Sequence, residues 1–206
     1  TTVTGDVHIP DTVTSIGDEA FWGNNNLSEV ILPDHLICIG ANAFYSCENL
    51  MDITFPDTVI SIRNNAFAGC RSLTNIILPD TIRSIGADAF DSCDSLKNIT
   101  LPSKITRIEE GTFAGCNSLT NIILPDTITE IGAETFAGCR SLTQIAIPDA
   151  VTEIGDGTFR YCNALQKITI PVSVTSIGKG AFQECTNLQE VTVPVLVTAI
   201  KPDTFI

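Results

Sequence analysis

The chain has 206 residues, of which 44% are hydrophobic and 17% are charged, and its formal net charge is -13 at pH 7. The apolar content suffices for a continuous core, and no low-complexity tract indicates disorder. The negative charge repels phosphate backbones and anionic lipids, and no stretch approaches the roughly 20 consecutive apolar residues of a membrane span. We therefore expect a folded domain that does not bind nucleic acid and does not insert directly into a membrane.

A repeat of 23 residues runs through the chain without an insertion or a deletion. Its markers are proline at 10, 33, 56, 79, 102, 125, 148, 171 and 194, phenylalanine at 21, 44, 67, 90, 113, 136, 159, 182 and 205, and cysteine at 47, 70, 93, 116, 139, 162 and 185. A unit of this size cannot bury its own apolar face, so each unit must stack on its neighbours. We predict one solenoid domain over residues 1–206, with eight full repeats from about residue 7 and a truncated ninth over residues 191–206.

The fourth repeat, residues 76–98, illustrates the elements expected in each unit. The run of residues 75–78 is short and rich in β-branched side chains. It ends at Pro79, which cannot donate a hydrogen bond to a strand ladder, so the run predicts a strand. Pro79-Asp80-Thr81 has turn chemistry. Stacked units would place these strands side by side in a parallel sheet.

The second half of the repeat has a helical spacing. Apolar residues recur at Ile85, Ala89, Cys93 and Leu96, which predicts a short α or 3₁₀ segment on the outer side. A wider outer layer would curve the stack and leave the sheet on the inner face. The expected fold class is therefore an α/β solenoid, a horseshoe with a parallel sheet on its concave face and short helical segments on its convex face.

The pattern Leu73-x-x-Ile76-x-Leu78, followed by Pro-x-x-Ile-x-x-Ile-Gly-x-x-Ala-Phe-x-x-Cys, resembles the BspA-like, treponemal-type subfamily of 23-residue leucine-rich repeats. The match covers about residues 7–206. The resemblance implies a leucine-rich-repeat horseshoe in a surface-exposed or secreted protein that takes part in adhesion to host matrix proteins and in cell–cell aggregation. One departure is that the usual asparagine ladder is mostly threonine. We expect hydroxyls to stabilise the turns instead, at Thr12, Thr58, Thr81 and Thr127.

Seven of the eight cysteines share one register of the repeat, so their side chains should point the same way. A disulfide needs converging Cβ atoms ~3.8 Å apart, whereas equivalent atoms in stacked units lie about 5 Å apart with parallel Cβ vectors. We predict a row of free, buried thiols beside the phenylalanines. Cys38 is out of register, and we expect it to be exposed and reactive. No Cys-x-x-Cys pair indicates zinc.

Nothing in the chain indicates catalysis. His8 and His35 are the imidazoles, they occupy different repeat positions, and we expect both to be solvated. Neither a Gly-x-Gly-x-x-Gly run nor a Walker-type loop is present. We predict no enzymatic activity and no cofactor.

A row of aspartates follows the prolines, at Asp11, Asp34, Asp57, Asp80, Asp126 and Asp149. One interpretation is that each carboxylate caps its turn by accepting hydrogen bonds from the following backbone amides. The alternative is calcium bridging between units, which would require six to eight oxygen ligands for each ion. We predict no metal site and leave the calcium alternative open.

Outward-pointing strand residues form two rows that combine amides, carboxylates and β-branched side chains. The candidate binding residues in these rows are Glu29, Ile31, Asp52, Thr54, Asn75, Ile77, Asn98, Thr100, Asn121, Ile123, Gln144 and Lys167. They fit either a ladder of cross-strand contacts that stabilises the sheet or an extended protein-binding surface.

We expect a non-enzymatic adhesion or protein-recognition module, extracellular or at the cell surface, that binds a protein partner through its concave sheet. The alternative is a scaffold or assembly module that works through its ends. The last repeat stops at Phe205 and Ile206 and leaves the side of Leu188, Val191 and Val193 uncovered. That ending favours a fragment of a longer chain, or head-to-tail self-association of copies.

Overall fold

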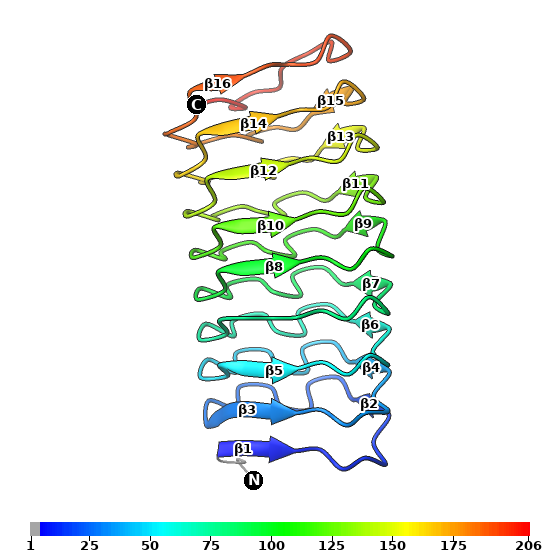
Figure 1. The fold of residues 1–206 in the computed structure, drawn as a ribbon. Coiled ribbons are helices and arrows are strands. Elements are labelled where there is room, and N and C mark those ends of the chain that lie inside the picture. Colours follow the sequence, from blue (N-terminus) through cyan, green and yellow to red (C-terminus); the bar gives the residue numbers. More distant parts are fainter. Residues whose placement is uncertain (1–4) are drawn as a thin grey trace.

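The computed structural model describes residues 5–206 and shows a solenoid of stacked coils, each one repeat long (Figure 1). Most coils contain two short strands joined by turns. The first strands are β1 (Gly5–His8), β3 (Leu27–Ile31), β5 (Asp52–Thr54), β8 (Asn98–Thr100), β10 (Asn121–Ile123), β12 (Gln144–Ala146), β14 (Lys167–Thr169) and β16 (Glu190–Val191). The second strands are β2 (Ser15–Ile16), β4 (Cys38–Ile39), β6 (Ser61–Ile62), β7 (Ser84–Ile85), β9 (Arg107–Ile108), β11 (Glu130–Ile131), β13 (Glu153–Ile154) and β15 (Ser176–Ile177).

All strand pairs are parallel, and equivalent residues of neighbouring repeats are almost always directly paired. In β8 and β10, for example, Asn98 is opposite Asn121 and Ile99 is opposite Ile122. The middle residue of each three-residue first strand is buried and its two neighbours are exposed, because successive side chains in a strand point to opposite faces. The invariant 23-residue period therefore fixes the register, and the predicted parallel-sheet solenoid is confirmed.

The strand ladders are interrupted in places. The strand expected over residues 75–78 is reduced to isolated bridges from Asn75 to Asp52 and Asn98. Within residues 5–206, no pairing joins β7 to β9 or β10 to β12. The first strands therefore belong to three short sheets and the second strands to two.

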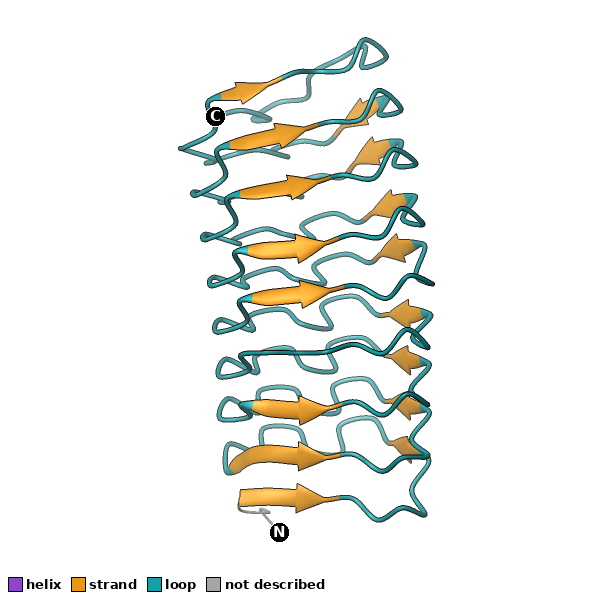
Figure 2. Ribbon diagram, in the orientation of Figure 1, coloured by secondary structure: helices purple, strands orange, loops and turns teal. Residues whose placement is uncertain are grey.

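The helical segments predicted for the outer side are wrong, because residues 5–206 contain no helix (Figure 2). In the second coil, Asn42 and Ser46 both have a φ of 54°, in the left-handed region, and equivalent positions in the other coils also have positive φ. Their N–H groups donate to Asn64 and Ala68 of the next coil, while the N–H of Tyr45 turns back to Asn42. In a helix, each of these residues would have a negative φ, and each N–H would donate to a carbonyl oxygen of the same segment.

This outer side forms a ladder of its own. At the junction above, N–H groups of residues 42, 44 and 46 donate to carbonyl oxygens of residues 64, 66 and 68 at 2.9, 2.8 and 2.7 Å. The same three positions bond at every junction from the coil of Glu19 to the coil of Glu184, and we call this the turn ladder. It replaces the wide helical layer from which the horseshoe was predicted. The fold class is a parallel-sheet β-solenoid.

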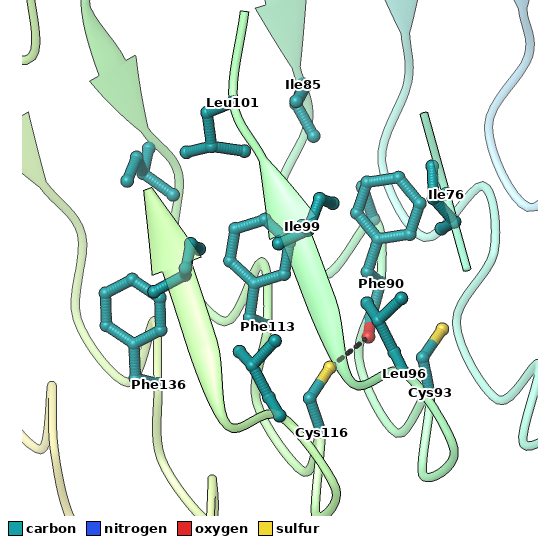
Figure 3. Close-up of a cluster of buried hydrophobic side chains, with 14 of the residues drawn as sticks. Ile76, Ile85, Phe90, Cys93, Leu96, Ile99, Leu101, Phe113, Cys116 and Phe136 are labelled. Carbon is teal, nitrogen blue, oxygen red and sulfur yellow. Dashed lines mark hydrogen bonds between the residues drawn. The ribbon is translucent and has the colours of Figure 1, made fainter. Parts of the chain in front are cut away.

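The core contains a column of phenylalanine rings and a column of thiols, packed among buried leucine and isoleucine side chains (Figure 3). Rings of neighbouring coils stack nearly parallel, with centroids 5.7 Å apart for Phe90 and Phe113 and 5.9 Å apart for Phe113 and Phe136. The Cys116 thiol donates to the carbonyl oxygen of Phe90 in the preceding coil, with Sγ and O 3.2 Å apart. Each in-register cysteine makes the equivalent bond.

The predicted row of free, buried thiols is confirmed: all eight cysteines are free, and the seven in register are buried. Burial raises the pKa of Cys47 and of Cys185 to about 11 and raises the pKa of Cys116 well above its usual range. Since the thiolate is the nucleophile, these thiols are inert in the folded chain.

Hydroxyls stabilise the turns at three of the four predicted threonines, Thr58, Thr81 and Thr127. Thr81 Oγ1 donates to the carbonyl oxygen of Val59 at 2.8 Å, and Thr127 Oγ1 donates to that of Ile105 at 2.7 Å. These bonds link the three turns to the coil before them.

Candidate functional site

The outward side chains of the first strands form one continuous surface, which we call the first-strand face. It contains all of the candidate residues, each of them exposed: Glu29, Ile31, Asp52, Thr54, Asn75, Ile77, Asn98, Thr100, Asn121, Ile123, Gln144 and Lys167. Residues of adjacent coils are directly opposite where the strands pair, about 4.8 Å apart in the pairing direction. The two predicted rows are therefore present as continuous stripes.

The first stripe changes in charge along the stack. It begins with acidic side chains, continues with four amides, and then reaches Lys167, in the order Asp6, Glu29, Asp52, Asn75, Asn98, Asn121, Gln144, Lys167, Glu190. Lys167 is its single basic residue and forms no ion pair with any residue in the range 5–206. The face therefore offers carboxylates at one end, hydrogen-bonding amides in the middle and an unpaired ammonium group near the other end.

The second stripe supplies apolar contact area. Ile31, Ile77 and Ile123 are 41%, 85% and 54% exposed, and threonines occupy most of the other positions. Exposed β-branched side chains on adjacent parallel strands pack against one another, and they also present a stiff surface that loses little rotamer entropy on binding. Both interpretations made from the sequence are compatible with this geometry.

The first-strand face is not flat. A hollow of about 510 Å³ lies between β10 and β12 and is lined by Asn121, Ile123, Gln144, Ala146 and Lys167, among others. Another hollow, of about 480 Å³, is lined by residues 75–78 and β8. Both coincide with places where strand pairing is reduced or interrupted.

The other candidates behave differently. His8 and His35 are exposed, as predicted. Cys38 is partly buried, and its Sγ accepts a hydrogen bond from Ser61 Oγ at 3.2 Å. In the aspartate row, Asp80 accepts a bond from the N–H of Ser103 in the next coil at 3.1 Å, rather than from its own turn. No three His, Cys, Asp or Glu side chains within residues 5–206 gather to hold a metal ion.

The opposite side of the coil carries charge pairs and an acidic group. Arg107 contacts Glu109 at 2.9 Å and Glu130 at 3.5 Å, both partly solvated. Partial burial and the nearby Glu110 and Glu134 raise the pKa of Asp88. Exposed ion pairs of this kind contribute about 0–1 kcal/mol each, and nothing about their arrangement indicates a site.

Sequence reasoning missed an aromatic pair on the turn side. The exposed indole of Trp22 packs against the ring of Tyr45 at a tilt of 37°, with centroids 4.7 Å apart. The signal was present, because both occupy one repeat position, where the third coil has Ala68.

In the part of the chain that the structure describes, no helix is long and apolar enough to cross a membrane.

A family model described as the BspA type leucine rich repeat region, which is six repeat copies long, matches residues 3–118 and again residues 83–206. The chain belongs to the BspA-type leucine-rich repeat family. A leucine-rich repeat protein from Bacteroides ovatus has a solved structure that matches this BspA-type solenoid with a TM-score of 0.90 and 34% sequence identity, over 94% of this chain and 52% of that one. The chain thus spans about half the length of that relative.

Two further bacterial structures are similar to this BspA-type chain. The T. pallidum leucine rich repeat protein matches with a TM-score of 0.63 and 29% identity, over 90% of this chain and 78% of that one. A leucine rich cell surface protein from Faecalibacterium prausnitzii matches with a TM-score of 0.65 and 27% identity, over 97% and 72% respectively. No curated protein sequence matches the chain.

Proposed function

We propose that this BspA-type chain is a non-enzymatic protein-binding module of a cell-surface or secreted protein, and that it adheres to its partner through the first-strand face. The observation that carries the proposal is the pair of exposed stripes, in which amides and carboxylates run beside β-branched side chains over successive coils. Solenoids use extended surfaces of this kind for binding. One similar structure is that of a leucine rich cell surface protein, which supports the same location here.

Apolar and polar side chains of the first-strand face would contribute to binding in different ways. Exposed isoleucines supply apolar area, and the amides and carboxylates select a partner with complementary polar groups. A partner that matches the first stripe would place basic groups over its acidic end. Because the chain carries a charge of -13, encounter with basic protein surfaces would be accelerated and would depend on salt.

Binding to purified extracellular matrix proteins, such as fibronectin, laminin and collagen, tests the proposal. A triple variant, Asn75→Lys, Asn98→Lys and Asn121→Lys, changes the middle of the first stripe. The matched control, Thr106→Lys, Thr129→Lys and Thr152→Lys, makes the same charge change at exposed positions beside the second strands. We expect the first variant to weaken binding by about tenfold or more, and the control by less than about twofold.

Two results would contradict the proposal. If no matrix protein binds the unaltered chain, adhesion to matrix fails. If both triple variants bind as tightly as the unaltered chain, the first-strand face is not the binding surface.

A further inference from the structure

The hollow between β10 and β12 lies where the first strands stop pairing. β8 pairs with β10 and β12 pairs with β14, each at three positions, but β10 and β12 are not paired. The backbone hydrogen bond just before these strands is also missing at this junction. Thr120 N–H donates to Lys97 and Gln166 N–H donates to Thr143, yet no bond joins Thr143 to Thr120.

The opening is confined to one side of these coils. On the second-strand side, Ile131 of β11 pairs with Ile154 of β13, and on the turn side the N–H of Phe136 donates to Thr158 at 2.9 Å. The coils are therefore held together while their first strands leave backbone donors and acceptors without coil-to-coil partners. Cα atoms of β10 and β12 still lie within 8 Å of each other, so a whole strand does not fit between them, and a ligand reaches these groups only from the exposed side.

The side chains around the opening give it depth and charge. Ala146 is the smallest residue of the second stripe, where neighbouring coils carry isoleucine or threonine, and its size leaves room above Ile122 and Ile145. The volume of about 510 Å³ falls within the range of about 300–1,000 Å³ typical of ligand sites. The hollow of about 480 Å³ at residues 75–78 and β8 has amides at its edge but no charged group.

Charge complementarity identifies the occupant. The Lys167 ammonium group lines the hollow and has no ionic partner among residues 5–206. Asn121 and Gln144 add amides that both donate and accept. Lys167 lies opposite Glu190 in the pairing of β14 with β16 but forms no ion pair with it, so its ammonium group can bind one carboxylate of a ligand, whereas a polyanion would be repelled by the net charge of -13.

We infer that this hollow is a subsite for an extended acidic peptide segment of a partner protein. The segment lies across the hollow from its exposed side: its backbone forms hydrogen bonds with the side-chain amides of Asn121 and Gln144, a small side chain lies over Ala146, and an Asp or Glu carboxylate binds Lys167. A charge-assisted bond of this kind is shorter and stronger than a neutral one. The inference deepens the proposed function and rests on it, since it places the chemistry of one contact within the first-strand face.

A titration of the full ¹⁵N-labelled chain with capped pentapeptides tests the inference. The probe is acetyl-Thr-Val-Asp-Val-Thr-amide, and its matched control carries Asn in place of Asp. We expect amide shifts over residues 121–124 and 144–147 and none over 75–78, with the Asn peptide binding about fivefold more weakly or worse. Lys167→Gln should remove the difference between the two peptides.

A pair of variants tests the role of the hollow itself. Ala146→Ile fills it with a side chain that the same stripe already carries in other coils, and should abolish the shifts. Thr54→Ile makes a similar change in the same stripe, far from the opening, and should leave them unchanged.

Each negative outcome has a definite meaning. Absence of shifts at 121–147 with millimolar peptide, or undiminished binding by Ala146→Ile, would overturn the inference. Shifts there with a glucuronic acid disaccharide but with neither peptide would overturn it in favour of an acidic sugar. If the peptide fails while Asn75, Asn98 and Asn121 still govern matrix binding, the subsite is wrong and the proposed function stands.

Discussion

The turn side and the strand side of each coil join neighbouring coils in different ways. The turn ladder repeats the same three backbone bonds at every junction, and it lies beside the phenylalanine and cysteine columns. Strand pairing, by contrast, is interrupted between β10 and β12 and between β7 and β9. The turn side therefore holds the stack together, so side chains of the first-strand face can vary in sequence and its strand pairing can be interrupted.

The largest expected effect concerns the thiol column, and it is a loss of stability in alkali. Burial raises the pKa of Cys47 from its usual value of 9.0 to about 11. The stabilisation is fully present below pH 9, where thiols are protonated in both states, and is lost as pH rises toward 11, because the unfolded chain ionises first. Each such thiol contributes about 1.4 kcal/mol per pH unit, so urea unfolding should show a steep fall over this window.

The variant Cys47→Ser is the control for this prediction, because serine does not titrate there. Its unfolding free energy should fall less steeply, by about one thiol's share of the slope. An unchanged free energy between pH 9 and pH 11 would show that the cysteine column is not protected from solvent.

Truncation of one ring should separate the two sides next most strongly. Phe113→Ala leaves a cavity in a fully buried column, and we expect it to lower the free energy of unfolding by about 3–5 kcal/mol. Ile123→Ala, on the first-strand face of the next repeat, should cost less than about 1 kcal/mol, because its side chain is already half exposed. Equal losses in urea titrations would refute the idea that the turn side holds the stack.

Backbone conformation offers a smaller contrast of opposite sign. Glu134 has a φ of 55°, so Glu134→Gly should stabilise the chain by about 1 kcal/mol. Asn98→Gly, in a strand, should instead destabilise it by roughly 0.5–1 kcal/mol. Because Glu134 also repels Asp88, Glu134→Gln serves as the control: it relieves the repulsion and keeps the backbone strain. If the glutamine variant gains as much as the glycine variant, strain is not the cause.

The smallest perturbation is chemical labelling of native thiols. Cys38 lies in β4, beside Ser61, and is only partly buried, whereas the thiols of the column are buried. Iodoacetamide at neutral pH should therefore modify Cys38 well before the others, as peptide mass spectrometry would show. Simultaneous labelling of several cysteines would mean that the turn side opens as readily as the strand side.

The sequence predicted the parts of the fold that depend on the repeat period. Pro79 and its equivalents fixed the register, and the shared position of Phe90 and Cys93 predicted columns of rings and free thiols. The helical segment was misread, because a spacing of four from Ile85 to Ala89 fits a pair of tight turns as well as a helix. Gly69, with a φ of 74°, argued against a helix at this position. Equivalent positions are occupied by Ser46 and Tyr161, which have positive φ although they are not glycine, so the sequence did not show that every coil has a left-handed residue there.

The candidate surface could be predicted only in part. Alternation around Ile99 and Ile122 placed the exposed rows correctly. The hollow could not be foreseen, since it depends on pairing lost between two particular strands. The sequence Asn-Ile-Ile-Leu occurs at both 75–78 and 121–124, yet it forms a paired strand at the second site and only a bridge at the first.

Successive coils contact one another through the same thiol-to-carbonyl hydrogen bond, so the stacking surface of one coil is complementary to that of many others. Whole units can therefore be gained or lost by unequal recombination without redesigning an interface. Residues 68–82 and 114–128 differ only at Arg71 and Asn117, as expected from such a duplication. A lineage can thus lengthen the first-strand face one coil at a time while selection acts separately on its outward rows.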